Sequence, residues 1–206
     1  MKYGYLPGLM WCVFAQGFKK HLYMVSDKNV NDLMRSAHRK YKKILSDVQE
    51  FDKDDRFIFN ILSAAMLAAV YLSLDKKTEV ESLTEYYAES MDNFIMRLFL
   101  KKSNRYTEDY QKALQKGTQK SKSRNNLYSW VYDFEWGDDI NSFTAAFHIC
   151  GICYLLNSLG IGEITPAMCR YDYTMAEKAG TEFTRQYTLA LGGRYCDCHY
   201  NNRRAE

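Results

Sequence analysis

Hydrophobic residues recur every three or four positions through the first half of the chain, which is the spacing of one helix face. The first such stretch follows Ser26 and Asp27, either of which can cap a helix that continues to about Phe51. The next stretch, residues 57–74, is apolar on every side and must be buried in lipid or in protein. Its length of roughly 18 residues approaches a membrane span, but the flanking segments are amphipathic and can cover it. We therefore predict a central helix that is buried inside the protein.

Two more helices are predicted before the middle of the chain. Thr78 and Glu81 have the spacing of a capping box, and hydrophobic residues continue at helical spacing to about Lys101. A polar helix is expected over residues 107–116, before a connector at residues 117–126 that is rich in Lys, Ser and Asn. These assignments make the first half of the chain mainly helical.

Beyond the connector the hydrophobic pattern changes to a period of two. Aromatic residues alternate with other residues over 130–136, and a second alternation covers 143–149. The sequence Gly137-Asp138-Asp139 between them predicts a turn, so that the two strands form a hairpin. Thr165 followed by Pro166 is typical of a helix start. Helices are therefore expected over residues 150–159 and 165–178.

A second hairpin is predicted near the C-terminus. Gly192-Gly193 is suited to a two-residue loop between strand-like runs at 182–191 and 194–200. Arg185 and Cys196 then face one side of the hairpin, whereas Asp197 faces the other. The register places Leu189 opposite Cys196, Tyr187 opposite Cys198 and Arg185 opposite Tyr200.

Two hairpins, each preceded by helical material, indicate an α+β fold. We expect a four-stranded antiparallel sheet made of two hairpins, with the helical N-terminal half packed on one face of it. The whole chain, residues 1–206, is expected to be a single domain. Its mainly helical part is 1–116, and its hairpin-helix-hairpin part is 127–206.

Composition narrows the range of functions. Hydrophobic residues make up 47% and charged residues 26%, as in a globular protein. The formal net charge of +3 is too small and too evenly spread to indicate a nucleic-acid partner, and no membrane partner is expected. The 6 cysteines are too sparse for a disulfide scaffold. We expect a cytoplasmic protein with free thiols, and an exposed face of the helix after Thr78 leaves a homodimer open.

The last third of the chain contains four motifs, namely Cys150-Gly151-Ile152-Cys153, Cys169-Arg170-Tyr171-Asp172-Tyr173, Arg185-Gln186-Tyr187-Thr188-Leu189-Ala190-Leu191-Gly192-Gly193 and Cys196-Asp197. In this order they resemble the L-2-amino-thiazoline-4-carboxylic acid hydrolase family, and residues 37–74 are more loosely similar to its helical region. The family is named for the hydrolytic opening of a 2-aminothiazoline ring to give N-carbamoyl-cysteine. This chain has Cys198 where the family usually has phenylalanine, and His199 where it commonly has arginine.

The resemblance implies a hydrolase that opens a cyclic amidine or thiazoline ring of a small carboxylate substrate. Such a reaction needs a general base, a proton donor for the leaving sulfur and a cation for the substrate carboxylate. Asp172 is the candidate base, and Cys169 projects from the same helix face three residues earlier. Arg185 is the candidate carboxylate clamp, because its planar guanidinium suits bidentate pairing. Cys196 is the candidate nucleophile or proton donor.

Three more residues, Cys153, His199 and Asp197, are candidate substrate contacts. Asp197 also suits a structural hydrogen bond, for instance with Thr188. Each cysteine alone is well explained as a packing residue, and Asp172 with Arg185 as a structural ion pair.

Two other functions remain open. Zinc binding is an alternative interpretation of the cysteines, because Cys150 and Cys153 have the spacing of zinc ligands. We nevertheless expect no cofactor or metal. The order of helices and hairpins is also similar to ligand-binding domains of the bacteriochlorophyll-reductase-associated and vesicle-tethering type. The alternative function is therefore a non-catalytic module that binds or senses a small ligand.

Overall fold

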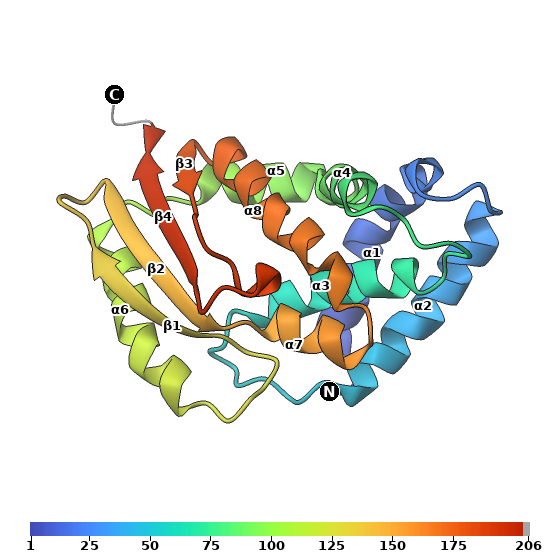
Figure 1. The fold of residues 1–206 in the computed structure, drawn as a ribbon, viewed down its shortest axis with the longest axis horizontal. Helices are drawn as coiled ribbons and strands as arrows, with labels where there is room; N and C mark the ends of the chain where they lie inside the picture. The colour runs from blue at the N-terminus through green and yellow to red at the C-terminus, as the bar shows by residue number, and fades with distance from the viewer. Residues whose placement is uncertain (204–206) are drawn as a thin grey trace.

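The computed structural model describes residues 1–203 and has a sheet beside a group of helices (Figure 1). In Figure 1 the sheet lies to the left, α1 to α4 lie to the right, and α8 crosses the space between them. The helices are α1 (Tyr5–Lys20), α2 (Val30–Asp47), α3 (Ile58–Tyr71), α4 (Val80–Met91), α5 (Phe94–Lys102), α6 (Glu108–Ser123), α7 (Gly151–Ser158) and α8 (Thr165–Lys178). The strands are β1 (Val131–Trp136), β2 (Ser142–Ile149), β3 (Thr181–Thr184) and β4 (Cys196–Asn202).

The strands form one antiparallel sheet in the order β1-β2-β4-β3. Tyr132, Phe147 and Cys196 lie opposite one another on neighbouring strands and belong to the apolar face. The next row, on the other face, holds Asp133 and Asp197. Helices α6 and α8 contact the apolar face, through the hydrogen bond from Tyr132 Oη to the backbone oxygen of Leu114 and the ring contact of Tyr173 with Phe183. The predicted α+β fold is confirmed.

The central helix α3 is enclosed by other parts of the chain. Every residue from 61 to 71 is buried, and α1, α2 and α7 all contact the helix. Within the described residues, no helix is long and apolar enough to cross a membrane. The helix that precedes it, α2, begins later than predicted, because Asn29 provides the cap by accepting hydrogen bonds from the N–H groups of Asn31 and Asp32. The predicted cap at Ser26 or Asp27 is wrong, and α2 ends at Asp47 rather than near residue 51.

The helix predicted from Thr78 to Lys101 is two helices, α4 and α5. Glu79 precedes α4 and no side chain caps it, so the capping box of Thr78 with Glu81 is wrong. The helix ends at Met91 because Asn93 starts a new helix, α5, by accepting a hydrogen bond from Met96 N at 2.9 Å. A side-chain acceptor of this kind replaces the missing backbone partner of a helix start.

The connector predicted at residues 117–126 is largely helical, because α6 continues to Ser123. The local composition favours a loop, but contacts with β1 stabilise the helix. Ser121 Oγ accepts a hydrogen bond from Tyr132 N at 3.3 Å, and Tyr132 Oη donates to Leu114 O at 3.0 Å. Gly117 lies inside this helix, where a Cβ atom would come within 2.2 Å of Tyr132 Oη. Glycine therefore allows a close approach between helix and strand here, and it does not mark a loop.

The C-terminal hairpin differs from the prediction in its register and in its turn. Phe183 pairs with Tyr200, so the predicted partner, Arg185, is wrong by two residues. Residues 185–195 form a long connection in place of a two-residue loop, and Gly192 alone of the glycine pair has a positive φ, of 85°. Asp197 explains the difference, because its carboxylate accepts hydrogen bonds from the backbone N–H groups that follow Arg185. A shift of two residues still leaves the strand residues on the predicted faces.

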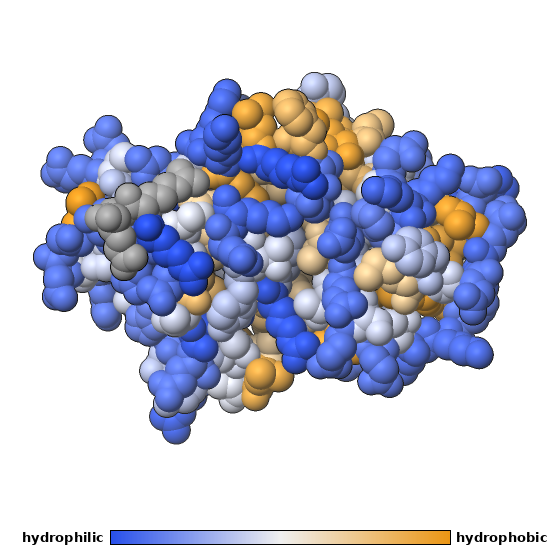
Figure 2. Space-filling view, turned by 90° about the horizontal axis from the view of Figure 1, so that it is seen from above, coloured by the Kyte–Doolittle hydropathy of each residue, from blue (hydrophilic) through white to orange (hydrophobic). Residues whose placement is uncertain are grey.

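The surface of α5 carries a group of exposed apolar side chains. Phe94, Ile95, Leu98 and Phe99 are between 40% and 78% exposed. The orange patch at the top of Figure 2 lies over this helix. A contiguous patch of large apolar residues is characteristic of interaction surfaces. The homodimer expected from the sequence stays a prediction.

Candidate active site

The centre of the candidate site is an ion pair between α8 and the segment after β3. Arg185 Nη1 donates a hydrogen bond to Asp172 Oδ2 at 3.0 Å, and Nη2 donates to the backbone oxygen of Cys169 at 2.9 Å. Cys169 and Asp172 are three residues apart on α8, so one guanidinium can reach both. The structure thus brings together three of the residues selected from the sequence.

The rest of the Arg185 side chain is enclosed by the protein. Its guanidinium lies over the rings of Phe183 and Tyr173, at 5.3 Å and 5.6 Å from their centroids. Only 5% of the side chain is exposed, and among the described residues Nε has no hydrogen-bond partner. Both terminal nitrogens of Arg185 therefore donate to protein groups, as in the structural ion pair that the sequence left open.

Asp172 is the member of the pair that solvent reaches, since 41% of its side chain is exposed. The surrounding protein displaces enough water to raise the pKa of Asp172 above its ordinary value, although the charge of Arg185 and the weaker influence of Arg105 oppose this. A carboxylate that is accessible and has a raised pKa suits a general base. Asp172 therefore has the environment that the proposed chemistry requires.

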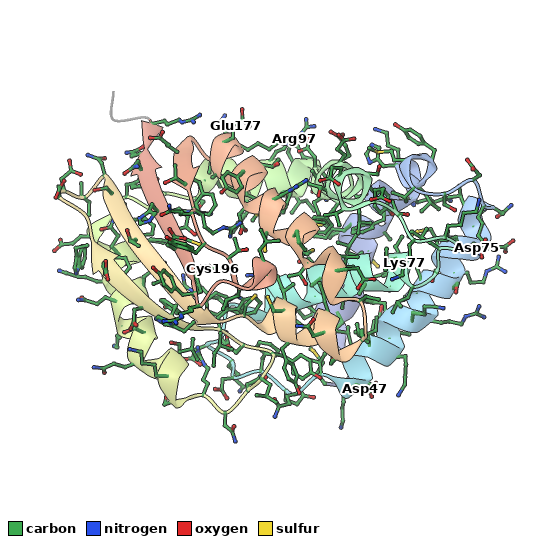
Figure 3. All side chains as sticks on the ribbon, viewed as in Figure 1. Asp47, Asp75, Lys77, Arg97, Glu177 and Cys196 are labelled. Atoms are coloured by element: carbon green, nitrogen blue, oxygen red, sulfur yellow. The ribbon has the colours of Figure 1, made fainter. Side chains whose placement is uncertain are left out.

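The thiols around this pair hold their protons at neutral pH. Burial raises the pKa of Cys169 to about 12, and the nearby Asp172 carboxylate adds to this effect. Burial also raises the pKa of Cys196, although its sulfur accepts a hydrogen bond from Leu189 N at 3.3 Å. Cys196 begins β4, at the lower end of that strand in Figure 3. Cys198, two residues on, is buried, with its pKa raised to about 12 by burial. None of the three is a thiolate nucleophile in the resting protein.

Asp197 and His199 lie on the opposite face of the sheet from the ion pair. The Asp197 carboxylate accepts hydrogen bonds from Gln186 N at 3.1 Å and from Tyr187 N. Burial raises the pKa of Asp197, but these donors outweigh it, so that the pKa lies below its ordinary value. The suggested bond with Thr188 is wrong, because the described donors to the Asp197 carboxylate are backbone N–H groups, and Thr188 Oγ1 accepts from Leu191 N.

His199 makes its own contacts on this face. The distance between His199 Nδ1 and Thr144 Oγ1 is 2.8 Å. Asp197 and His199 are thus separated from Asp172, Arg185 and Cys196 by the sheet itself.

The last selected residue, Cys153, lies in the first turn of α7, which Cys150 precedes as the N-cap. Both thiols are partly buried. In residues 1–203, no three His, Cys, Asp or Glu side chains are arranged to hold a metal ion. The zinc alternative therefore has no ligand set in the described part of the chain.

Two hollows open on the surface, and neither is lined by any of the selected residues. One, of about 420 Å³, lies between α6 and β1. The other, of about 330 Å³, is lined by Arg105, Lys101 and the ends of β3 and β4. Arg105 lies 5.3 Å from the ring centroid of Tyr200 and also lowers the pKa of Asp172. Sequence analysis missed it, because an arginine in an irregular segment between two helices has no distinguishing spacing.

Comparison with known proteins gives one match. Residues 59–200 match the family described as L-2-amino-thiazoline-4-carboxylic acid hydrolase. The matched region runs from α3 to β4 and contains all seven residues selected from the sequence. Neither the curated proteins nor the solved structures include a match to this chain.

Proposed function

The chain belongs to the L-2-amino-thiazoline-4-carboxylic acid hydrolase family, and from this premise we propose that it is a hydrolase for a cyclic amidine or thiazoline of a small carboxylic acid. The observation that carries the proposal is the accessible Asp172 carboxylate, held by the buried Arg185 beside Cys169. An oriented base next to an enclosed cation is the arrangement that hydrolytic addition to an amidine carbon needs.

In the proposed reaction Asp172 activates a water molecule. The carboxylate takes one proton while the water oxygen bonds to the amidine carbon, and the electron pair of the C=N bond moves to the ring nitrogen, which gives a tetrahedral adduct. The hydroxyl proton of this adduct then moves to the ring nitrogen as the C=O bond forms, the bond from the carbon to the ring sulfur breaks, and the sulfur leaves as a thiolate. Asp172 returns the proton to this thiolate, which is the stronger base. The product of a 2-aminothiazoline would be a carbamoyl amine with a free thiol.

The other residues receive narrower roles than the sequence implied. Cys196 and Cys169 hold their protons, so we assign them as hydrogen-bond donors to the departing sulfur rather than as nucleophiles. Arg185 orients Asp172, because its donors are engaged there and at the backbone of α8. Arg105 is then the cation for the substrate carboxylate: it is partly exposed, and among the described residues no ion pair involves it.

The test is hydrolysis of 2-aminothiazoline-4-carboxylate, measured as free thiol in the filtrate after the protein is removed. We expect Asp172→Asn to lower the rate by about 10²–10⁴-fold, the contribution of a general base. Asp133→Asn is the matched control, because Asp133 is 42% exposed and also pairs with cations, but lies on the other face of the sheet. A lack of turnover on this substrate and on related cyclic amidines, or equal losses in both variants, would contradict the proposal.

The non-catalytic alternative has one observation in its favour. The thiols are protonated, and both terminal nitrogens of Arg185 donate to protein groups, so the same cluster also suits a purely structural role. A binding module would be stabilised against heat by a ligand that is recovered chemically unchanged. Recovery of the intact 2-aminothiazoline after incubation, together with a raised melting temperature, would favour that function over hydrolysis.

A further inference from the structure

Cys150 and Cys153 stand together at the start of α7. Cys150 is the N-cap, with φ −127° and ψ 116°, and Cys153 is the third residue of the helix, which begins at Gly151. Side chains three residues apart lie on the same side of a helix. Consistent with this, the Cys153 thiol is the largest influence on the pKa of Cys150, ahead of burial. The two side chains therefore lie side by side at the helix start.

The backbone that carries the pair is held in place from outside the helix. A Cβ atom at Gly151 would lie 1.9 Å from the backbone oxygen of Tyr128, so the helix start is pressed against the segment before β1. The N-cap backbone of Cys150 also accepts the first hydrogen bond of the helix, from Tyr154 N at 3.1 Å. The relative position of the two cysteines is thus set before any reaction takes place.

We propose that Cys150 and Cys153 are a redox-active dithiol, which the disulfide of a small thiol oxidises to an intramolecular disulfide. Metal binding does not account for the pair, since no third His, Cys, Asp or Glu among residues 1–203 completes a ligand group. Packing alone does not require two thiols at capping positions of one helix start. The proposal is independent of the proposed hydrolase activity.

The exchange takes place in two steps. Cys153 attacks one sulfur of the small disulfide, which forms a mixed disulfide and releases one small thiol. The Cys150 sulfur then attacks Cys153, releases the second small thiol and closes the bond between the two residues. The protein gives up two electrons and two protons, and the small disulfide takes them up as its two thiols. The Cys153 thiol and burial both raise the pKa of Cys150, so Cys150 is assigned the second step.

The test uses the full chain with Cys12→Ser, because Cys12 is exposed and remote in sequence from the motif. The protein is equilibrated with mixtures of reduced and oxidised glutathione, the remaining thiols are blocked, and the peptides are mapped by mass spectrometry. We expect a disulfide between Cys150 and Cys153, with a loss of two titratable thiols. An unchanged thiol count, glutathione adducts without an internal disulfide, or a disulfide that joins other cysteines would overturn the proposal.

Single variants distinguish the two steps. In Cys150→Ala the mixed disulfide has no resolving thiol, so one glutathione should remain attached to Cys153. In Cys153→Ala the attachment should be weaker, because burial still raises the pKa of the remaining thiol when Cys153 is absent. Cys169→Ala is the control that should still form the disulfide. Equal glutathione attachment in the first two variants contradicts the assigned order, and loss of the disulfide in the control contradicts the pair itself. Circular dichroism confirms that each variant is folded.

Discussion

Asp172 and Arg185 are 13 residues apart in the chain and are joined by a hydrogen bond of 3.0 Å from Nη1 to Oδ2. Because Asp172 belongs to α8 and Arg185 follows β3, this contact ties the last helix to the long connection that precedes β4. The pair is asymmetric, since the guanidinium is enclosed and the carboxylate remains open to solvent. The cation is therefore held inside the fold, while the anion stays accessible.

Replacement of Arg185 by lysine should destabilise the protein strongly. Lysine cannot donate to Asp172 and to the Cys169 backbone with one planar group, so we expect a loss of about 3 kcal/mol in the free energy of unfolding. Urea unfolding measures it. Arg97→Lys is the matched control, because Arg97 also pairs with a carboxylate but is 67% exposed, and it should lose less than about 1 kcal/mol. Similar losses in both variants would show that burial of the pair does not matter.

Replacement of Asp197 by alanine should loosen the connection between β3 and β4. The carboxylate accepts hydrogen bonds from two consecutive backbone N–H groups, those of Gln186 and Tyr187. Their loss should cost about 1–3 kcal/mol and should speed hydrogen exchange at both amides. Exchange of the Asn31 amide, which donates to the Asn29 side chain at the start of α2, serves as the internal reference. Unchanged exchange at Gln186 and Tyr187 would contradict the anchoring role.

Acid should remove the stability that Asp92 provides. Arg97 holds the pKa of Asp92 well below its ordinary value, with further help from Lys178. A carboxylate whose folded-state pKa is lowered stabilises the protein above the unfolded-state pKa of about 3.9 and stops doing so as the pH falls further. We expect Asp92→Asn to be less stable than the parent by about 1–2 kcal/mol at pH 7. In urea unfolding at a series of pH values this difference in stability should shrink below about pH 4. A difference that stays constant with pH would contradict a stabilising role of the ionised Asp92.

If Asp172 is the general base, the rate of hydrolysis should depend on its ionisation. Displaced water raises the pKa of Asp172 above its ordinary value, against the opposing charge of Arg185. The acidic limb of the rate profile should therefore have its midpoint above the ordinary carboxyl value of about 3.9, with activity lost as the pH falls through it. A midpoint at or below the ordinary value would exclude Asp172 as the titrating group.

Addition of one methyl group at Gly151 should disturb the start of α7. The new Cβ atom would meet the Tyr128 backbone oxygen at 1.9 Å, so Gly151→Ala should lose at least about 1–3 kcal/mol of stability. Gly160→Ala is the comparison, because Gly160 has a φ of 69° but no atoms within 4 Å of the added Cβ. It should lose about 1–2 kcal/mol, from the strained backbone alone. Thermal unfolding orders the two variants, and the reverse order would contradict the close contact.

The parts of the fold that sequence reasoning predicted well depend on local signals. The alternation in β1 and β2 and the Thr165-Pro166 start of α8 are each contained within a few residues, and the structure agrees with them. The errors arise where a distant residue changes the outcome. Tyr132 holds the end of α6 in a helix, and Asp197 takes the backbone donors that would have extended β3.

In the candidate site, too, sequence reasoning succeeded where the signal is local and failed where distant residues decide the outcome. The spacing of Cys169 and Asp172 is a local property of one helix, and the ion pair of Asp172 with Arg185 was expected from the sequence, whereas the bond of Arg185 to the Cys169 backbone was not. The protonated state of the thiols and the neighbourhood of Arg105 depend on burial and on the packing of segments far apart in sequence. No periodicity in the chain carries that information.

The order of the strands also bears on how the protein avoids aggregation. β1 and β3 are the outer strands of the described sheet. Along β1, the Ser121 hydroxyl of α6 occupies the Tyr132 N–H, which an incoming strand would otherwise engage. β3 is only four residues long, Thr181–Thr184, and offers little length for a foreign strand to pair with. Both borders of the sheet are thus poor templates for the strand-by-strand growth that leads to fibrils.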